Sequence, residues 1–403
     1  MLVTLPPVRS ADSNIVDNFI NDKVTCLPDT EEFKIHDYNP SLRLLRAGQG
    51  AIGLSVNQYG TGIAGGVNLV FSDILGNQLL GVTVRASGTL RDLGGQVIYR
   101  NRDRRINWGG GLAHIPYRTS RGASRTVVDT TETGDLIESR EINIVTRRTF
   151  YDRIDGMTEY PFSKSRRLEW SVGFTRIGYN LESEIYKVRN GQIIARDYES
   201  LETKEPLNIG SAAIAYVGDY SYFGFTSPVK GRRYRFELEP SFGSMQYLTA
   251  TADYRHYFFA CPVTFAFRGL HYGRYLRDSE NDRLSPLNLG FKTWVRGYSS
   301  GSFDYEECQA GDCPELNRLV GSKVGVVNAE IRVPISGSEQ LSLIDFRFLP
   351  TNFVAFVDGG VAWTKNEQPE FEFTRTSNRR IPVFSAGIAA RVNLFGYLVG
   401  QVY

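Results

Sequence analysis

The sequence predicts an all-β fold, a transmembrane antiparallel β-barrel of about 16 strands whose last strand we expect to be missing from this chain. From about Ser41 onward, segments of about ten residues alternate apolar with polar side chains between turn residues. No run of about 18 apolar residues occurs, which excludes transmembrane helices. Alternation is also found in soluble sandwiches. Aromatic residues near strand ends, at 216–223 and 254–259, favour a barrel in lipid.

Composition narrows the function classes. The chain has 403 residues with a mean hydropathy of −0.26, and such a mildly polar average fits a barrel because its apolar half is spread in alternation. The 46 basic and 44 acidic residues are scattered, so no nucleic-acid partner is expected. Arginine pairs such as Arg104-Arg105, Arg147-Arg148 and Arg166-Arg167 are interpreted as solvated turn residues rather than anion sites.

The N-terminal segment differs from the rest of the chain in composition and residue pattern. Residues 1–38 are polar and irregular, with Pro6-Pro7 and an acidic cluster from Asp29 to Glu32. They lack the apolar run of a signal peptide. We therefore expect residues 1–38 to be a periplasmic linker or the tail of a preceding domain, and residues 39–403 to form the barrel.

Strict alternation assigns a face to each residue of the predicted strands. Along residues 80–87, the apolar side chains lie on one face and Thr83 and Arg85 on the other. Charged residues recur on that second face in the late strands, which we interpret as the lumen side. The late residues expected there are Asn328, Glu330, Arg332, Phe356, Asp358, Gly360, Ser385, Gly387, Ala389, Arg391 and Asn393.

Connections alternate in length, as short periplasmic turns and longer outer loops do in bacterial barrels. Short connections are predicted at 75–77, 101–104, 160–163 and 260–262, and long ones at 119–138, 190–206 and about 277–320. Counting hairpins gives about fifteen strands, one fewer than the even number usual for a closed barrel. The segment at about 277–320 is the sixth outer loop by this count.

Cysteine placement points to an oxidising compartment. Cys308 and Cys313 lie close together in the long loop, where a small disulfide ring is geometrically possible. Cys261 falls in a predicted periplasmic turn and Cys26 in the N-terminal segment, so a Cys26–Cys261 bridge is a second hypothesis. Its alternative is a pair of unpaired cysteines. The spacing does not suit zinc, and no metal site is expected.

Three short motifs follow one another in the order Val295-Arg296-Gly297-Tyr298, Glu330-x-Arg332-x-Pro334 and Phe356-x-Asp358-x-Gly360. If the long loop folds into the lumen, Arg296 needs an acid, because an unpaired guanidinium away from water is costly. Asp358 and Glu330 are both on lumen faces, and a carboxylate can hold arginine bidentately. Gly297 would permit a sharp turn, and Gly360 would leave space opposite. The alternative is a solvated Arg296 and an Asp358 that caps a turn.

These ordered motifs resemble the BamA/TamA-type outer-membrane assembly barrels, the bacterial surface antigen superfamily. The resemblance covers about residues 40–403 and implies that the sixth loop is held in the lumen by Arg296 and Asp358, with Glu330 as a second acid. The residue patterns at 65–76 and 160–163 are similar to those of the subgroup of these barrels that is found C-terminal to TolB-like propellers. We find no POTRA-like repeats before the barrel segments of this sequence and expect its closing strand to be missing; both would depart from the family pattern.

The resemblance implies a non-enzymatic protein of the bacterial outer membrane with a periplasmic N-terminus, in contact with lipid, partner proteins and unfolded clients. The alternative is an anchor or pore that tethers a periplasmic domain without inserting proteins. A third class, a barrel fused to a hydrolase, lacks a nucleophile here: Gly297-Tyr298-Ser299-Ser300-Gly301 matches a serine elbow but without the helix that the elbow requires. The four histidines show no metal spacing, and no cofactor is expected.

Overall fold

The computed structural model describes residues 38, 40–49, 53–57, 60–88, 90–130, 136–291, 293–298, 317–338, 342–372, 379–396 and 398–402. The chain divides into two units, Met1–Ser41 and Leu42–Tyr403. Almost all of the first unit lies outside the described residues, so the predicted domain boundary stays a prediction. All the described strands belong to the second unit.

Strands make up nearly all the regular structure of the described residues, which confirms the predicted all-β class. Among them no helix is long and apolar enough to cross a membrane. The elements are β1 (Arg43–Gln49), β2 (Gly53–Asn57), β3 (Gly60–Ser72), β4 (Gln78–Gly88), η3 (Leu90–Asp92), β5 (Leu93–Asn101), β6 (Asn107–Thr130), β7 (Leu136–Ser163), β8 (Arg166–Arg189), β9 (Gln192–Leu201), β10 (Leu207–Asp219), β11 (Tyr222–Phe223), β12 (Pro228–Gly243), β13 (Tyr247–Ala260), β14 (Val263–Tyr275), β15 (Leu287–Asn288), β16 (Val320–Gly321), β17 (Lys323–Gly337), β18 (Ile344–Asp345), β19 (Thr351–Trp363), β20 (Val383–Leu394) and β21 (Leu398–Val402).

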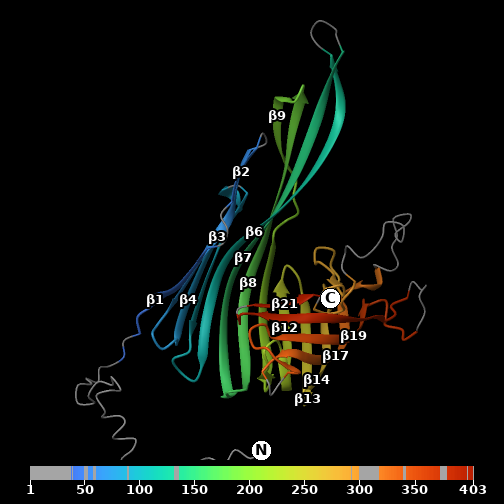
Figure 1. Cartoon of the computed structure of the whole chain (residues 1–403). Coiled ribbons are helices and arrows are strands. Elements are labelled where there is room, and N and C mark those ends of the chain that lie inside the picture. The colour runs from blue at the N-terminus through green and yellow to red at the C-terminus, as the bar shows by residue number, and fades with distance from the viewer. Residues whose placement is uncertain are drawn as a thin grey trace, which may run out of the picture. The chain divides into compact units, whose positions relative to one another are not determined.

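One large sheet contains 19 of these strands, and its long ladders are antiparallel (Figure 1). The described strands occupy fifteen ladder positions, because β1 and β2 both pair with β3, β9 and β10 both pair with β8, and β11 and β18 are short additions to β12 and β17. This agrees with the sequence count. Within the described residues the sheet does not close, since no pairing joins β21 to β1 or β2.

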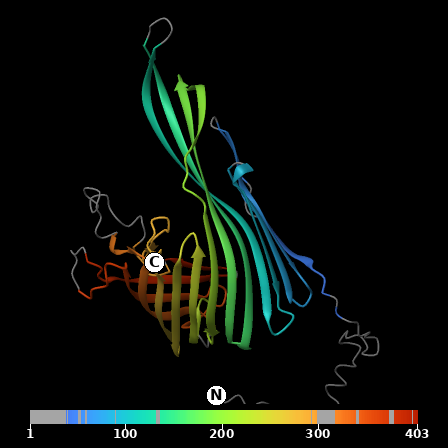
Figure 2. The ribbon, with the colours of Figure 1, turned by 180° about the vertical axis from the view of Figure 1, so that it is seen from behind.

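The C-terminal half of the sheet is strongly curled, as Figures 1 and 2 show. The side-chain amide of Asn393, at the end of β20, donates to the carbonyl of Phe225, 168 residues earlier in the chain and beside β11. The Arg332 side chain on β17 likewise donates to the Pro228 carbonyl at the start of β12. These contacts bring strands that are several ladder positions apart across the inside of the curl.

Three central strands are much longer than a membrane crossing requires. β6, β7 and β8 have 24, 28 and 24 residues, whereas a transmembrane strand needs about ten. We call their protruding part, residues 115–130, 136–150 and 178–189 together with β9, the extension (Figure 1). The predicted long loops at 119–138 and 190–206 are therefore wrong: most of these residues are paired strand. Both faces of the extension are polar, which made these strands look like loops.

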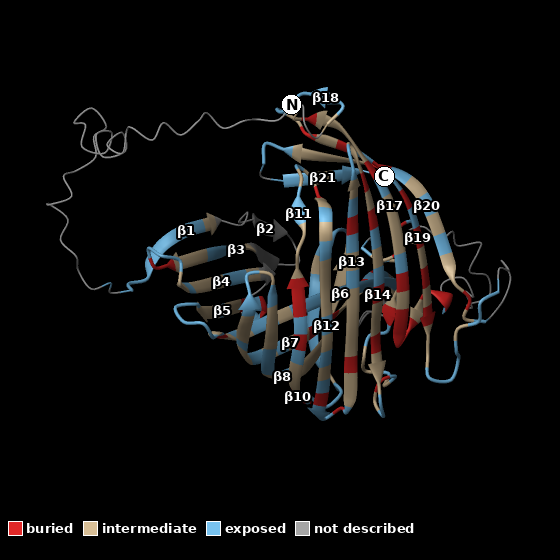
Figure 3. Cartoon of the chain, turned by 90° about the horizontal axis from the view of Figure 1, so that it is seen from below, coloured by how far each residue is buried: buried red, intermediate tan, exposed pale blue. Residues whose placement is uncertain are grey.

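The two faces of the sheet differ as alternation predicted. In β19, buried and more exposed residues alternate along the strand, as Figure 3 shows. The face that carries Asn328, Glu330 and Asp358 is the inner face. The opposite, outer face is apolar, and its exposed large side chains include Val84, Val97, Leu112, Ile154, Phe174, Ile214, Leu238, Tyr254, Phe267, Val327, Ile331, Phe353, Val357, Phe384 and Ile388.

The main apolar core lies between the inner face and the connection from β14 to β17. Leu287, Leu289, Val295 and Leu319 of this connection are buried against side chains of the three neighbouring strands. β15 and β16 pair with each other and form the stem of the connection. The strand partners in this cluster are Leu270, Val324, Val326 and Ala362.

Candidate functional site

The connection between β14 and β17 is the sixth on the side opposite the short turns, following those after β2, β4, β6, β8 and β12. It folds onto the inner face instead of extending away from the sheet, because its apolar side chains are buried there. Residues 299–316 of it lie outside the described residues. The described part brings Arg296 to the middle of β17 and β19, and we call this connection loop 6.

Arg296 is held between the two acids named from the sequence. Its Nε and Nη2 donate to the two carboxylate oxygens of Asp358, each at 2.6 Å, and its backbone N–H donates to the same carboxylate at 3.1 Å. Its Nη1 donates to Glu330 at 2.7 Å. A bidentate pair of this kind fixes the direction of both side chains as well as their charge. Arg296 is 6% exposed and Asp358 is fully buried.

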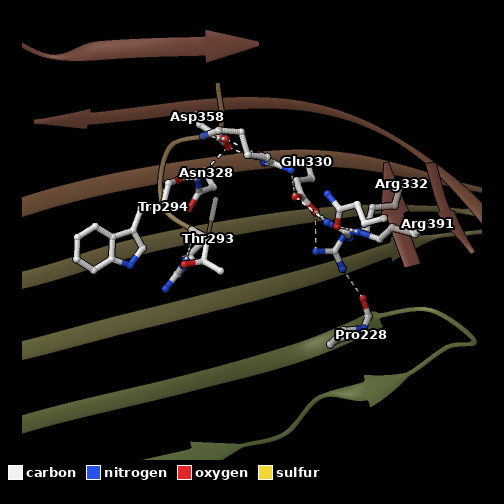
Figure 4. A network of polar contacts seen from close by, with 11 residues as sticks. Pro228, Thr293, Trp294, Asn328, Glu330, Arg332, Asp358 and Arg391 are labelled. Atoms are coloured by element: carbon white, nitrogen blue, oxygen red, sulfur yellow. Dashed lines mark hydrogen bonds and ion pairs between the residues drawn. The ribbon is translucent and has the colours of Figure 1, made fainter. Parts of the chain in front are cut away.

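The acids are themselves tied to the wall (Figure 4). Asn328 donates from its side-chain amide to Asp358 at 2.8 Å and to the Trp294 carbonyl at 2.7 Å. Glu330 accepts from Arg332 at 2.8 Å and from Arg391 at 3.0 and 3.1 Å, in addition to its bond from Arg296. One carboxylate thus joins three guanidinium groups from loop 6, β17 and β20.

An aromatic ring also contacts the Arg296 guanidinium. The Arg296 guanidinium lies over the ring of Phe356, 3.6 Å from its centroid, which adds a cation–π attraction. On β20, a Cβ at Gly387 would lie 2.8 Å from that ring, too close for any other residue without displacement. Phe356 therefore sits between Arg296 and the bare backbone of Gly387.

Two glycines have conformations or spaces that other residues would not tolerate. Gly297 has φ +91°, in the region that favours glycine, and this turn directs Arg296 towards the wall. A Cβ at Gly360 would lie 2.7 Å from Val295 and 3.0 Å from Leu289, so loop 6 packs directly against the backbone of β19. Gly290, which sequence reasoning did not select, leaves room for the Tyr298 carbonyl.

The remaining predicted residues also lie in this region. The Tyr298 hydroxyl donates to the Phe384 carbonyl of β20 at 2.7 Å. Arg332 joins Glu330 to the Pro228 carbonyl of β12. The structure therefore brings together Arg296, Gly297, Tyr298, Glu330, Arg332, Asp358 and Gly360, the seven residues selected from the sequence.

The energetic character of this cluster follows from its burial. A buried ion pair adds little net stability, but removal of one partner leaves an uncompensated charge and costs about 3–5 kcal/mol. Asp358 has no exposed surface through which water could replace Arg296. The arrangement therefore specifies one position of loop 6 strongly. A cavity of about 480 Å³ adjoins it, lined by Arg255, Arg268, Arg296, Glu330, Arg332 and Arg391 among others.

Sequence reasoning missed several members of the site. Asn328, Phe356 and Arg391 were placed on the correct face but given no role, although they share the alternation of Glu330 and Asp358. A second buried cluster was missed altogether. Arg148 was interpreted as a solvated turn residue, but it is 5% exposed and donates to Asp92 at 2.8 Å and to Glu182.

The other candidate sites from the sequence are the disulfides, the serine-elbow match and a metal site. Cys261 is a free, exposed cysteine, so the proposed Cys26–Cys261 bridge is not present, because nothing pairs with the Cys261 thiol. Cys26, Cys308 and Cys313 lie outside the described residues, as do Ser299, Ser300 and Gly301 of the serine-elbow match. No group of three potential metal ligands occurs in the part of the chain that the structure describes.

Among the solved structures that resemble the chain are two bacterial proteins. BamA from Haemophilus ducreyi lacking POTRA domains 1–3 is 13% identical, with a TM-score of 0.47, over 88% of this chain and 68% of that one. CdiB from Acinetobacter baumannii is 14% identical, with a TM-score of 0.41, over 86% of this chain and 53% of that one. The chain thus spans about half the length of CdiB. No family model and no curated protein matches the sequence.

Proposed function

We propose that this chain is a non-enzymatic outer-membrane β-barrel of the protein insertion and translocation type, with loop 6 held in its lumen by Arg296. The observation that carries the proposal is the contrast between the two faces of one sheet. The outer face exposes apolar residues in strand after strand, as lipid contact requires. The inner face carries the ionic cluster that fixes loop 6.

Lateral rows of side chains support lipid contact. Leu112, Ile154 and Phe174 face one another across β6, β7 and β8, and all three are about half exposed. A water-soluble sheet seldom leaves such a continuous apolar surface uncovered. Charged groups of the inner face pair with one another and with loop 6, as Glu330 does with Arg332, Arg391 and Arg296, which is expected for a lumen wall.

The alternative function is an outer-membrane anchor or pore that tethers a periplasmic domain or partner complex and inserts no protein. It shares the fold and the loop 6 contacts. The two functions differ in what the membrane-inserted chain does to a second, unfolded barrel protein. Only the insertion function predicts faster folding of that protein into vesicles that already contain this chain.

The Arg296 contact is tested by charge exchange in chain folded into phospholipid vesicles. We expect Arg296→Asp and Asp358→Arg each to lower the temperature at which heated but unboiled samples lose the folded band in gel electrophoresis. The double variant should recover only part of that loss, because Glu330 would still repel an aspartate at position 296. Arg121→Asp, an exposed change in the extension, is the matched control.

Two outcomes would contradict the proposal. A double variant that is no more stable than the less stable of the two single variants would show that Arg296 and Asp358 do not act as a pair. Failure of the wild-type chain to associate with vesicles would remove the membrane assignment itself. An unchanged folding rate of the second barrel protein would favour the anchor.

A further inference from the structure

Basic residues are concentrated at one end of the central strands. We call this region the basic rim: the three short connections and flanking residues at 101–106, 163–167 and 218–233. These segments contain two acids, Asp103 and Asp219. They contain nine basic residues: Arg102, Arg104, Arg105, Lys164, Arg166, Arg167, Lys230, Arg232 and Arg233.

The three segments form one continuous edge. The strands that they join are neighbours in the sheet, since β6 pairs with β7 and β8 pairs with β10. The backbone N–H of Asp219 donates to the carbonyl of Ser165 at 2.8 Å, which ties the second connection to the third. Asn107 and Glu159 bond across β6 and β7 beside the first connection.

Most of this positive charge has no ion pair with an acid among the described residues. Arg167 pairs with Glu169 and Arg233 with Asp219. The other seven basic residues of the rim form no ion pair with a described acid. On the inner side, a cavity of about 680 Å³ is lined by Arg100, Arg102, Lys164, Arg166, Arg167 and Arg235, against Glu159 and Glu169.

Aromatic rings accompany these cations. The Arg105 guanidinium lies 4.8 Å from the centroid of Tyr160, and that of Arg232 lies 5.2 Å from Tyr220. Trp108 and Trp170 lie on the outer face close to the same edge and are 50% and 40% exposed. Aromatic rings beside cations at the border of an apolar surface are typical of a lipid headgroup region.

The opposite end of the same strands is different. In the extension, cations and anions are interspersed and several are paired, as in Arg125 with Glu141 and Arg196 with Glu184. A mixed surface of this kind has no preference for one sign of charge. The excess of positive charge is thus specific to the short-turn end of the sheet.

We propose that the basic rim binds the phosphate groups of anionic phospholipids in the leaflet that the short turns contact. This inference rests on the proposed function, because it needs the apolar outer face to lie in a bilayer. The outer face would contact the acyl chains and the aromatic rings would lie at the interface. The unpaired cations would bind the phosphates. Each cation near an anionic membrane surface is worth about 1 kcal/mol, or about fivefold in affinity.

The experiment uses tryptophan fluorescence of chain folded into equimolar vesicles of phosphatidylcholine and phosphatidylglycerol, with one or the other lipid brominated. Bromine quenches tryptophan at contact, and Trp108 and Trp170 lie beside the rim. We expect stronger quenching by brominated phosphatidylglycerol. In Arg104→Gln/Arg105→Gln that preference should fall about fivefold for each charge removed. Arg121→Gln/Arg125→Gln in the extension should keep the wild-type preference.

The remaining outcomes contradict either the proposal for the basic rim or the proposed function. Equal quenching by the two lipids, or equal preference in the rim variant and the wild type, overturns the rim proposal alone. Absence of quenching by either lipid overturns the proposed function. Inorganic phosphate should not displace phosphatidylglycerol more than chloride at equal ionic strength does; displacement would show a site for free phosphate and would overturn the lipid assignment.

Discussion

Arg296 and Arg148 are each buried between two carboxylates, but the two clusters are built in opposite senses. In the first, loop 6 supplies the arginine and the wall supplies Asp358 and Glu330. In the second, the short segment η3 supplies Asp92, and the wall supplies Arg148 and Glu182. Asp92 and Glu182 are only 1% and 3% exposed. Both arrangements attach a connection to the same sheet, but on opposite faces: the register places Arg148 and Glu182 on the face of Ile154 and Phe174, whereas Asp358 and Glu330 are on the inner face.

The surroundings of the two clusters differ. Loop 6 also buries Leu289 and Val295 in the main apolar core. The described side chains beside Asp92 give no comparable support: Leu93 is half exposed, and the Arg91 side chain is 67% exposed where it reaches Glu182. The described attachment of η3 is therefore ionic, whereas loop 6 combines charge with apolar burial. Three substitutions test this difference.

The largest effect is expected from Arg148→Met. It removes the buried cation shared by Asp92 and Glu182 and leaves these carboxylates with more exposed partners such as Arg91 and Arg118, which should cost about 3–5 kcal/mol in the free energy of unfolding. Denaturant unfolding in detergent and amide hydrogen exchange at 90–93 measure this. Adding Asp92→Asn and Glu182→Gln removes both carboxylate charges and should restore much of the loss. If the triple variant is as unstable as the single one, charge is not what holds η3.

Leu289→Ala tests the apolar support that the Arg148 cluster lacks. Leu289 is fully buried, and its truncation should cost about 2–5 kcal/mol because a cavity remains. Amide exchange of loop 6 should rise while the Arg296 pairs persist. Leu343→Ala, at an exposed position, is the matched control. Equal effects of the two substitutions would show that loop 6 does not depend on its apolar contacts.

The smallest effect is expected from Gly360→Ala, which adds a methyl group where Val295 and Leu289 approach the wall. Overpacking of this kind costs about 1–3 kcal/mol. Gly269→Ala is the control, because a Cβ there meets nothing within 4 Å. Thermal loss of the folded form on unboiled gels compares the two variants. If Gly269→Ala is the more damaging, loop 6 does not press against β19.

Alternation allowed much of this site to be predicted from the sequence. Because strand side chains point to opposite faces with a period of two, Glu330 and Asp358 could each be placed on the polar face of its own strand. The order of the three short motifs selected Arg296, and the need of a buried guanidinium for an acid linked it to these two residues. The fifteen ladder positions and the span of loop 6 were predicted from turn lengths in the same way.

The Arg148 cluster could not be predicted by this reasoning. Asp92 lies in a short connection where alternation does not apply, and Glu182 is separated from Arg148 by 34 residues. Arg148 and Glu182 also share a face with apolar residues such as Ile154 and Phe174, so alternation did not mark them as polar partners. The extension was missed for a related reason: its strands are polar on both faces, and the expected apolar row is absent there.

The attachments of loop 6 have a mechanical consequence. Residues 289–298 bond to β17, β19 and β20 through Arg296 and Tyr298, and to β14 through the Arg268 side chain. None of these anchors belongs to β1 through β8. Another part of loop 6 reaches β8, because the Arg283 guanidinium lies 5.4 Å from the centroid of the Tyr179 ring. Loop 6 therefore links β8 to β20, and a hinge motion that separates these strands would have to break some of its contacts.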